Sequence, residues 1–497
     1  MKTLKLFIDN QWCDSDKGKT FDLTNPANGQ VIASVVDATA ADVDRAVAVA
    51  TRTFNSGIWS KMLPDDRARI MLEVARLLGE RAQEFAQLEC QDSGKPISET
   101  TAIDIPYSMR ALEYFANIAR EIKGEVIPIK GHDIFDFQTY EPYGVVAAIT
   151  PWNFPLHLFT RAICPALAAG NCVVAKTSPL TPLTCGMLGE LFLEAGMPAG
   201  VINIIHGGAE PGQALVSHPD VHMITFTGSE NVGRSIMQAS ARSKVIKKMI
   251  LELGGKGAFV ADADCDIDAA VNSVLVGFCL TQGQVCCAST RLYLHQDIYE
   301  PFMQLLIERA RKIKIGDPMD PQTQFGTLMN QTQLDNMDQA IRKAVDDGAR
   351  LLTGGKRLTT PPLDKVFYYP PTILEVDNNA LDCVQQEIFG PVLTVKRIAS
   401  LDEGVDMAND SCYALGAALW CRDIKKLFKA ARRLDAGTVW MNMNLMSTME
   451  APFGGNKNSG LGREYGTMGL REYMKVKNQM IYLDPQEPDF YGFSDAK

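Results

Sequence analysis

The sequence predicts an α/β fold of two doubly wound α/β domains, with a small β element outside both. Short apolar runs alternate with helical segments from Tyr143 to Gly254, and a second series of the same kind follows Gly255. Strands that are apolar along their whole length are typical of parallel sheets buried on both faces, with helices as crossovers. The polar, alternating stretch Phe135–Glu141 fits neither series and predicts a hairpin strand.

The first series follows one long helix. Pro64-Asp65-Asp66 is a good helix start, apolar residues recur at helical spacing up to Cys90, and Asp92-Ser-Gly-Lys-Pro ends the helix. Strands are then expected at Val145–Ile149, Cys172–Ala175, Val201–Ile205, Met223–Phe226 and Ile250–Leu253. Helices are expected between them at Thr160–Ala169, Pro182–Ala195, Pro211–Ser217 and Val232–Ser243.

The second series has the same alternation. Helices are expected at Ile267–Cys279, Ile298–Ile313, Gln333–Asp347, Leu401–Ala408 and Ile424–Leu434. Strands are expected at Arg291–His295, Val392–Ile398, Ala417–Cys421 and Thr438–Asn442. Asn478–Leu483, near the C-terminus, predicts one more strand outside both sheets.

The composition argues against a nucleic-acid or membrane partner. Of the 497 residues, 46% are hydrophobic and 22% are charged, and the formal net charge is −10. A dedicated nucleic-acid binder usually carries a basic face instead. The charge-free run Ala269–Thr290 is interrupted by Asn272 and by Gln282-Gly-Gln, so it does not predict a membrane span.

The cysteines indicate a reducing compartment. Twelve of them run from Cys13 to Cys421, none forms a CxxC pair, and no Cys/His cluster has the spacing of a zinc site. The N-terminal apolar stretch stops at Asp9, too early for a secretory signal. We therefore expect free thiols in a cytoplasmic protein without a metal site.

The segment Gly228–Ser235 is a near match to a phosphate-binding P-loop, since it follows a strand and opens a helix. Arg234 stands where a P-loop has Lys, whose compact charge an Arg does not reproduce. Two alternatives remain: a plain strand-to-helix turn, or a helix N-terminus that binds a pyrophosphate through backbone N–H groups. The GxGxxG fingerprint of dinucleotide sites is absent.

Three other positions could carry chemistry. Cys286 follows a Gln-Gly-Gln-Val turn after a helix, and is either an exposed nucleophile or a buried structural cysteine. Glu252 ends an apolar run, where an unpaired carboxylate is costly, so it is either an ion-pair partner, for example of Lys256, or a base with a tuned pKa. Asn153, on the rigid loop 151–155, either donates an amide hydrogen bond to a ligand or caps its turn.

Taken together, six segments resemble the signature blocks of the aldehyde dehydrogenase superfamily, in the same order. They are Pro151-Trp-Asn-Phe-Pro, Phe226-Thr-Gly-Ser, Glu252-Leu-Gly-Gly-Lys, Gly283-Gln-Val-Cys286, Glu387-Ile-Phe-Gly-Pro and Pro452-Phe-Gly-Gly-Asn-Lys-Asn-Ser-Gly. The resemblance extends from about Phe7 to about Tyr482. Six spaced motifs in one order are far more specific than any one of them.

The resemblance implies NAD(P)-dependent oxidation of an aldehyde to a carboxylic acid, through a thiohemiacetal and a thioester on Cys286. It assigns oxyanion stabilisation to Asn153 and activation of the hydrolytic water to Glu252. Because Glu252 separates hydrolytic members from those that end on coenzyme A, a free acid is the expected product. Glu464 matches a carboxylate of a proton relay, whose usual Lys is replaced by Ala162.

The expected cofactor is NAD or NADP. The residues that match its site are Trp152, Lys176, Pro179, Gly208, Gly228, Ser229, Glu387 and Phe389. The resemblance places the pyrophosphate at Gly228 and Ser229, the adenosine ribose at Lys176 and the nicotinamide ribose at Glu387. Pro179 stands where the family often has a Glu that binds the adenosine ribose, so the preference between NAD and NADP stays open.

The positions that match the substrate tunnel are mostly apolar and indicate an aromatic or otherwise bulky aldehyde. They are Phe154, Leu158, Arg161, Leu280, Val285, Met446 and Phe453. Arg161 leaves two alternatives: it binds the anionic tail of a semialdehyde, or it forms a structural ion pair. More distant alternatives are a P-loop nucleotide hydrolase built on 228–235, and a fold kept for a structural role.

The resemblance also implies the domain organisation. Residues 1–128 and 144–253 are expected to form a Rossmann-like cofactor-binding domain, and residues 254–459 the catalytic domain. Residues 129–143 and 472–497 are expected to form a β element for oligomerisation. The chain is therefore expected to form a homo-oligomer, either a dimer or a tetramer.

Overall fold

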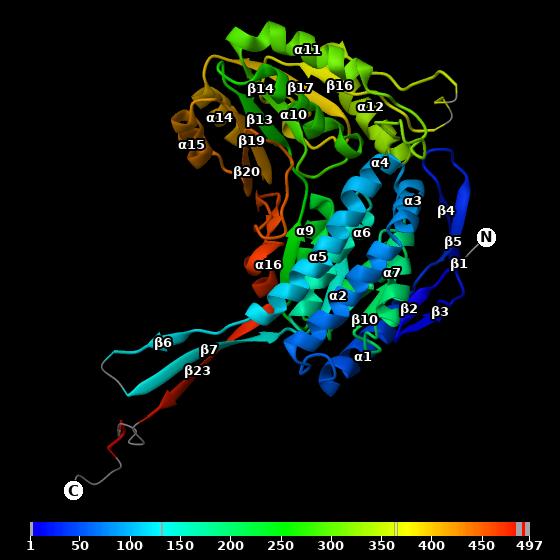
Figure 1. The fold of residues 1–497 in the computed structure, drawn as a ribbon, viewed down its shortest axis with the longest axis vertical. Coiled ribbons are helices and arrows are strands. Elements are labelled where there is room, and N and C mark those ends of the chain that lie inside the picture. The colour runs from blue at the N-terminus through cyan, green and yellow to red at the C-terminus, as the bar shows by residue number, and fades with distance from the viewer. Residues whose placement is uncertain (1–2, 131–132, 362, 365, 484–489, 493–497) are drawn as a thin grey trace.

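The computed structural model describes residues 3–130, 133–361, 363–364, 366–483 and 490–492. Two lobes, each built around its own sheet, lie one above the other, and a β arm projects from the lower lobe (Figure 1). Parts of the predicted oligomerisation element, residues 131–132, 484–489 and 493–497, lie outside the described residues.

The sheet of the lower lobe has eight strands, in the order β22-β12-β11-β8-β9-β10-β2-β3. Its five central strands are parallel: β8 (Val145–Ile149), β9 (Cys172–Lys176), β10 (Ile202–Ile205), β11 (Met223–Thr227) and β12 (Lys248–Glu252). The helices between them are α6 (Pro155–Ala168), α7 (Leu183–Glu194), α8 (Ala209–Ser217) and α9 (Glu230–Ala241). The predicted doubly wound sheet is confirmed, and each predicted strand is correct to within two residues.

The edges of this sheet were not predicted, because their strands are too short to show a pattern. β2 (Leu6–Ile8) and β3 (Gln11–Cys13) add antiparallel strands beside β10, and β22 (Gly460–Leu461) pairs antiparallel with β12. A small separate sheet contains β1 (Thr3–Leu4), β4 (Thr20–Thr24) and β5 (Val31–Val36). Near the C-terminus, the chain thus returns to the lower sheet and forms the edge strand beside β12.

The helical layer of the lower lobe differs from the prediction in one respect. The prediction of a single helix that ends near Cys90 is wrong. The structure has two helices, α2 (Pro64–Glu80) and α3 (Ala82–Ser93), separated at Arg81, which has φ −105° and ψ 15°. The Arg81 guanidinium pairs with Glu84 and with Glu190 of α7, which ties the start of α3 to α7. Two further helices, α1 (Ala40–Ser56) and α5 (Ile105–Ile118), were not predicted.

The upper lobe has a seven-stranded sheet, in the order β15-β16-β17-β14-β13-β19-β20. The parallel strands are β13 (Gly257–Ala261), β14 (Ser289–His295), β16 (Thr372–Glu375), β17 (Val392–Ile398), β19 (Gly416–Trp420) and β20 (Thr438–Met441), with β15 (Arg350–Thr353) antiparallel at the edge. Its helices are α10 (Ile267–Cys279), α11 (Tyr299–Lys312), α12 (Gln331–Asp346), α13 (Asp382–Gln385), α14 (Leu401–Asn409) and α15 (Ile424–Arg433). The second α/β unit is confirmed, although β13, β15 and β16 were not predicted.

The arm is a three-stranded antiparallel sheet of β6 (Val126–Pro128), β7 (Ile134–Pro142) and β23 (Met474–Tyr482) (Figure 1). The predicted hairpin strand pairs with the predicted C-terminal strand, which begins four residues earlier than expected. The remaining short elements are α4 (Ile97–Glu99), the π-helix η1 (Thr100–Asp104), α16 (Gly466–Glu472), and the paired strands β18 (Tyr413–Ala414) and β21 (Asn456–Lys457). Three short 3-10 helices complete the described elements: η2 (Ala119–Glu121), η3 (Leu280–Gly283) and η4 (Gln296–Ile298). Within the described residues, no helix is long and apolar enough to cross a membrane.

Candidate active site

A cavity of about 400 Å³ is lined by side chains from both lobes. It brings together all seven residues that the sequence assigned to the substrate: Phe154, Leu158, Arg161, Leu280, Val285, Met446 and Phe453. It also contains residues that sequence reasoning missed: Ile103, Tyr107, His157, Val276, Asn444 and Tyr465. Tyr107 could not have been found, because the helix that carries it was not predicted. Cys286 and Cys287 open onto the same cavity.

The thiol of Cys286 is half-buried and has a lowered pKa. A hydrogen bond from the Cys287 thiol and the nearby Arg161 guanidinium outweigh the effect of burial and bring this pKa to about 7. The same hydrogen bond raises the pKa of Cys287, and burial alone raises that of a core cysteine such as Cys164. Cys286 therefore differs from the structural cysteines, because a thiolate is accessible to it near neutral pH.

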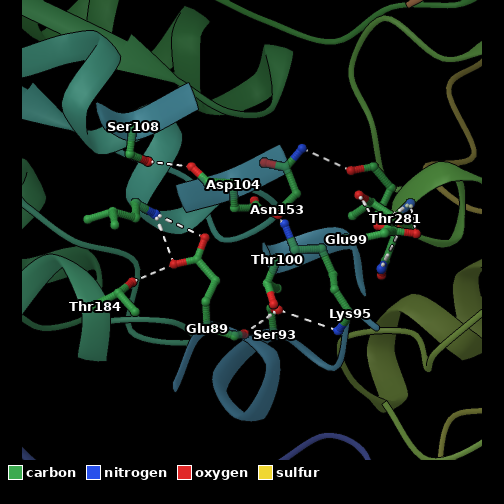
Figure 2. Close-up of polar contacts among 12 residues, drawn as sticks. Glu89, Ser93, Lys95, Glu99, Thr100, Asp104, Ser108, Asn153, Thr184 and Thr281 are labelled. Carbon is green, nitrogen blue, oxygen red and sulfur yellow. Dashed lines mark hydrogen bonds and ion pairs between the residues drawn. The ribbon is translucent and has the colours of Figure 1, made fainter. Parts of the chain in front are cut away.

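The loop before Cys286 has an unusual backbone. Thr281, Gln282 and Gly283 have φ of 50°, 55° and 70°, in the left-handed region. A left-handed conformation costs roughly 1–2 kcal/mol for a residue with a side chain, and is worst for a β-branched one. Thr281 is held there by Glu99, whose carboxylate accepts hydrogen bonds from the Thr281 backbone N–H at 3.1 Å and hydroxyl at 3.1 Å (Figure 2).

Asn153 hydrogen bonds to the same loop from the other side. Its Nδ2 donates to the backbone carbonyl of Gln284 at 2.9 Å, two residues before Cys286. The Gln284 side chain in turn donates to the carbonyl of Thr281 and accepts from the N–H of Met329. The amide of Asn153 thus contacts the nucleophile loop, a bond made across the two lobes.

Glu252, the last residue of β12, is enclosed. Its side chain is 2% exposed, and β22 lies across it, with Gly460 opposite Glu252. Among the described residues neither carboxylate oxygen has a hydrogen-bond partner, and neither does Nζ of Lys256. The expected alternative of an ion pair with Lys256 is therefore wrong. Burial raises the pKa of Glu252 well above its usual range, and the charge of Arg161 opposes this rise.

Arg161, on α6, is buried beside the reacting groups. Its Nη2 donates to the hydroxyl of Thr227 at 2.8 Å, and Thr227 lies opposite Glu252 in the pairing of β11 with β12. In the described part of the chain the guanidinium forms no ion pair, so the structural ion-pair alternative is wrong. Thr225, on the same face of β11, donates to Glu464 at 3.2 Å, and burial raises the pKa of Glu464 to about 7.

An aromatic group lines the rest of the cavity. The ring of His157 hydrogen bonds the Tyr465 hydroxyl through Nε2 at 2.9 Å and meets the Tyr107 ring edge-on at 5.4 Å. Burial and the neighbouring cations lower the pKa of His157 to about 3, so it is neutral at ordinary pH. The Phe154 ring is edge-on to His157 at 6.3 Å. Together these side chains favour flat, apolar ligands.

A second cavity, of about 520 Å³, lies beside α8 and α9 and is lined by Lys176 and Gly208 among others. Lys176 is buried, donates to the carbonyl of Thr177 at 3.1 Å, and has a pKa lowered to about 8 by burial. Ser229 is the N-cap of α9, and its side chain makes no capping hydrogen bond. Arg234 is bound to Glu230 at 2.6 Å, so it is turned along the helix and cannot act as a P-loop cation.

The other matched residues lie where the two lobes meet. Glu387 accepts from the N–H of Gly255 at 3.0 Å, and burial raises its pKa to about 7. Phe389, with φ 56°, meets the ring of Trp152 edge-on at 5.3 Å. Pro179 lies in the turn after β9. A buried ammonium, an uncapped helix start and a carboxylate are the donor and acceptor types that fit the phosphates and ribose hydroxyls of a dinucleotide.

Comparison with known proteins decides the family. The profile of the Aldehyde dehydrogenase family matches residues 12–479. The chain is also 41% identical over 479 residues to an aldehyde dehydrogenase of Enchytraeus buchholzi, an alignment that covers 96% of this chain and 95% of that protein. The chain belongs to the aldehyde dehydrogenase family. The P-loop hydrolase and structural-role alternatives are therefore wrong, and the protein is an NAD(P)-dependent oxidoreductase.

Solved aldehyde dehydrogenases share the whole fold. A variant of the betaine aldehyde dehydrogenase of Staphylococcus aureus, in complex with NAD⁺, superposes with a TM-score of 0.95 at 36% identity, covering 98% of this chain and 99% of that one. A variant of the indole-3-acetaldehyde dehydrogenase of P. syringae, with NAD⁺ and IAA, gives 0.94 at 39% identity, covering 97% of each. Members of this family use NAD or NADP.

Proposed function

We propose that this enzyme oxidises aromatic or other bulky apolar aldehydes to carboxylic acids, with Cys286 as nucleophile and Glu252 as general base. The observation that carries the proposal is the position of Cys286, whose lowered pKa gives a thiolate, at the wall of an aromatic-lined cavity. The P. syringae relative, whose name gives an aldehyde with an indole ring, supports the same substrate class.

The side chains account for the steps. The Cys286 thiolate attacks the carbonyl carbon, and an oxyanion develops. Asn153 has two amide protons, and because the Gln284 carbonyl accepts one, the other is left to donate to the oxyanion in this proposal. The backbone N–H of Cys286 is the second donor in this proposal. The nicotinamide cofactor supplies the hydride acceptor, and a thioester remains on Cys286.

Hydrolysis then requires a base. Glu252 lies beside Arg161 and Glu464 in an enclosed site, so a carboxylate here is poorly solvated and binds a proton strongly. It takes a proton from water as the water attacks the thioester carbonyl, and the acid and the Cys286 thiolate are released. Glu464, joined to Thr225, is proposed to accept the proton afterwards.

For the cofactor, we assign Trp152, Lys176, Pro179, Gly208, Gly228, Ser229, Glu387 and Phe389 to the binding site. Lys176 and Ser229 would bind the ribose and phosphate oxygens, and Glu387 would accept hydrogen bonds from the nicotinamide ribose. Because Pro179 brings no carboxylate near the adenosine ribose, we propose that NADP⁺ is accepted to an unusual degree for this family.

The test is a panel of aldehydes with NAD⁺ and with NADP⁺, followed by the absorbance of the reduced nicotinamide. We expect an arylacetaldehyde or benzaldehyde to have a higher kcat/KM than acetaldehyde, because each added methylene-sized group in an apolar pocket gains about 1–3 kcal/mol. Equal or better use of acetaldehyde would contradict the proposed substrate class. Turnover of none of them would contradict the proposed function.

A second substrate class, anionic semialdehydes, is supported by Arg161. The guanidinium lines the cavity and has no carboxylate partner among the described residues. A strong preference for a semialdehyde over the aromatic aldehydes, lost in Arg161→Ala, would establish this alternative. An unchanged order of substrates in Arg161→Ala would exclude it.

We also propose the domain and assembly assignments. Residues 1–128 and 144–253 would form the cofactor domain and 254–459 the catalytic domain, as the two large sheets suggest. The predicted oligomerisation element, 129–143 and 472–497, would join copies of the chain into a dimer or tetramer through the arm, on which Phe135, Val476 and Met480 expose apolar surface. β6 lies in the same sheet, so the arm also includes residues 126–128. All cysteines are free thiols, in keeping with a cytoplasmic enzyme.

A further inference from the structure

A group of charged side chains lies buried beneath the two catalytic loops, and the mechanism does not use it. Glu89, Lys95, Glu99 and Asp104, the buried cluster, come from the end of α3, the turn after it, α4 and η1 (Figure 2). Glu89 and Asp104 are fully inaccessible, and Lys95 is 1% exposed. Buried charges are costly unless they are paired, so a cluster of this kind calls for an explanation.

The members of the cluster are connected to one another. The Lys95 ammonium forms an ion pair with Asp104, and the charges of Asp104 and Lys95 both act on the carboxyl of Glu89. The charge of Lys95 also acts on Glu99. The four side chains are therefore coupled through their charges, and removing one of them changes the electrostatic balance of the others.

One end of the buried cluster binds the nucleophile loop. Glu99 accepts two hydrogen bonds from Thr281, from the backbone N–H and from the hydroxyl. Thr281 is the residue least suited to its left-handed conformation, because its side chain is β-branched. Glu99 is the partner that keeps it there, and the chain from Thr281 leads directly to Cys286.

The other end binds the loop of the oxyanion donor. Glu89 accepts from the N–H of Leu156, in the first turn of α6, at 3.3 Å. The Lys95 ammonium lies 4.1 Å from the centre of the Phe154 ring, within cation–π distance. Asn153 precedes Phe154, and its side-chain amide donates a hydrogen bond to the carbonyl of Gln284. The two loops that the buried cluster binds therefore also contact each other directly.

We propose that the buried cluster positions the Cys286 loop and the Asn153 loop relative to each other, and that Glu99 is the positioning residue for the nucleophile. This inference rests on the proposed function of Cys286 and Asn153. No member of the cluster lines the substrate cavity, so its effect reaches the reaction only through the two loops. Setting the distance between nucleophile and oxyanion donor is worth a large factor in rate, since a misplacement of ~1 Å costs about 100-fold.

The test compares Glu99→Ala, which removes both acceptors of Thr281, with Asp92→Ala. Asp92 is the control: it is fully buried, whereas Glu99 is half-buried, and it accepts a backbone hydrogen bond from Leu183 N–H at 3.0 Å. Among the described residues it forms no hydrogen bond with either catalytic loop. Steady-state kinetics, the unfolding midpoint and the rate at which iodoacetamide alkylates Cys286, followed by mass spectrometry of the peptide, are measured for each. The alkylation needs no aldehyde substrate.

In Glu99→Ala we expect kcat to fall by about 10- to 100-fold with a much smaller change in KM, and alkylation of Cys286 at pH 7 to slow. Asp92→Ala should lower the unfolding midpoint as much while keeping kcat. Glu99→Gln keeps a carbonyl acceptor for the Thr281 N–H and should retain most of the activity. Thr281→Asn, which tolerates the left-handed conformation, should restore part of kcat in the Glu99→Ala background.

Equal losses of kcat in Glu99→Ala and Asp92→Ala, or no rescue by Thr281→Asn, would overturn the proposal and leave the cluster a purely structural feature. Normal alkylation of Cys286 in Glu99→Ala would overturn it as well. A wild-type enzyme that oxidises no aldehyde would instead refute the proposed function, a result distinct from any of these.

Discussion

Replacing Glu252 with Gln should make the enzyme more stable at alkaline pH and nearly inactive. The carboxylate is 2% exposed and neither oxygen has a hydrogen-bond partner among the described residues. Burial raises its pKa in the folded chain above that of the unfolded chain, so folding favours the protonated form. The contribution of Glu252 to the free energy of unfolding is therefore fully present below the pKa of the unfolded chain, roughly 4.3. It is lost as pH rises towards the pKa of the folded chain, by about 1.4 kcal/mol for each pH unit that separates the two pKa values.

Glutamine has the same shape and no charge, so Glu252→Gln removes this cost without breaking a hydrogen bond. We expect the urea unfolding midpoints of wild type and variant to coincide near pH 4 and to separate at pH 8, with the variant more stable. Glu464→Gln is the control. It is equally enclosed, but the hydrogen bond from Thr225 stabilises its charged form and its pKa is raised only to about 7, so a smaller gain is expected.

In activity, loss of a general base slows the step it assists by about 10²–10⁴-fold. Because Glu252 is proposed to act on the thioester, stopped-flow absorbance should show a burst of about one reduced cofactor per site, followed by slow turnover. Loss of the burst would mean that Glu252 acts earlier, for example on the Cys286 thiol. A variant less stable than wild type at pH 8 would refute the description of Glu252 as an unpaired buried carboxylate.

Four other substitutions test the site. Cys286→Ala should abolish oxidation and leave cofactor binding intact. Cys287→Ala should keep turnover but shift the alkylation of Cys286 to higher pH, because a hydrogen-bond donor to the thiolate is lost. Loss of turnover in Cys287→Ala but not in Cys286→Ala would exchange the two roles. Pro179→Glu should shift the ratio of kcat/KM for NAD⁺ to kcat/KM for NADP⁺ towards NAD⁺ by about ten- to a hundredfold. This factor corresponds to a hydrogen bond to a charged group, which is worth roughly 1.5–3 kcal/mol. An unchanged ratio would contradict the role of Pro179. Arg161→Met should also shift the alkylation of Cys286 to higher pH, and an identical profile would show that its charge does not act on the thiol.

The central strands could be predicted because their residues have one possible environment. A run such as Val145–Ile149 is apolar on both faces, and only a sheet covered on both sides buries it. The edge strand Gly460–Leu461 has two residues and no pattern, and it exists because Glu252 and Leu251 lie opposite. The break at Arg81 is likewise set by a partner distant in sequence, Glu190.

The residues of the candidate site also divide into those that the sequence could identify and those that it could not. The motif residues proposed to contact the substrate could be named from their resemblance to a family, whereas the residues that hydrogen bond to the loops carrying them could not. Lys95 belongs to a segment that the sequence presents only as the end of a helix, and Thr281 is visibly unusual only once its φ is known. Backbone strain and buried ion pairs leave no periodic signal, because each depends on one contact made in the folded chain.

The late return of the chain to β12 has a consequence for synthesis. Asn153, Glu252 and Cys286 are all made well before residue 460, but Glu252 is covered by Gly460, and Glu464 bridges to Phe453 in the same late segment. A product that stops before Gly460 retains nearly all of both large sheets, yet its catalytic carboxylate remains open to water. The enclosure of Glu252 is therefore complete only after residues 460–461 have been made and have paired with β12.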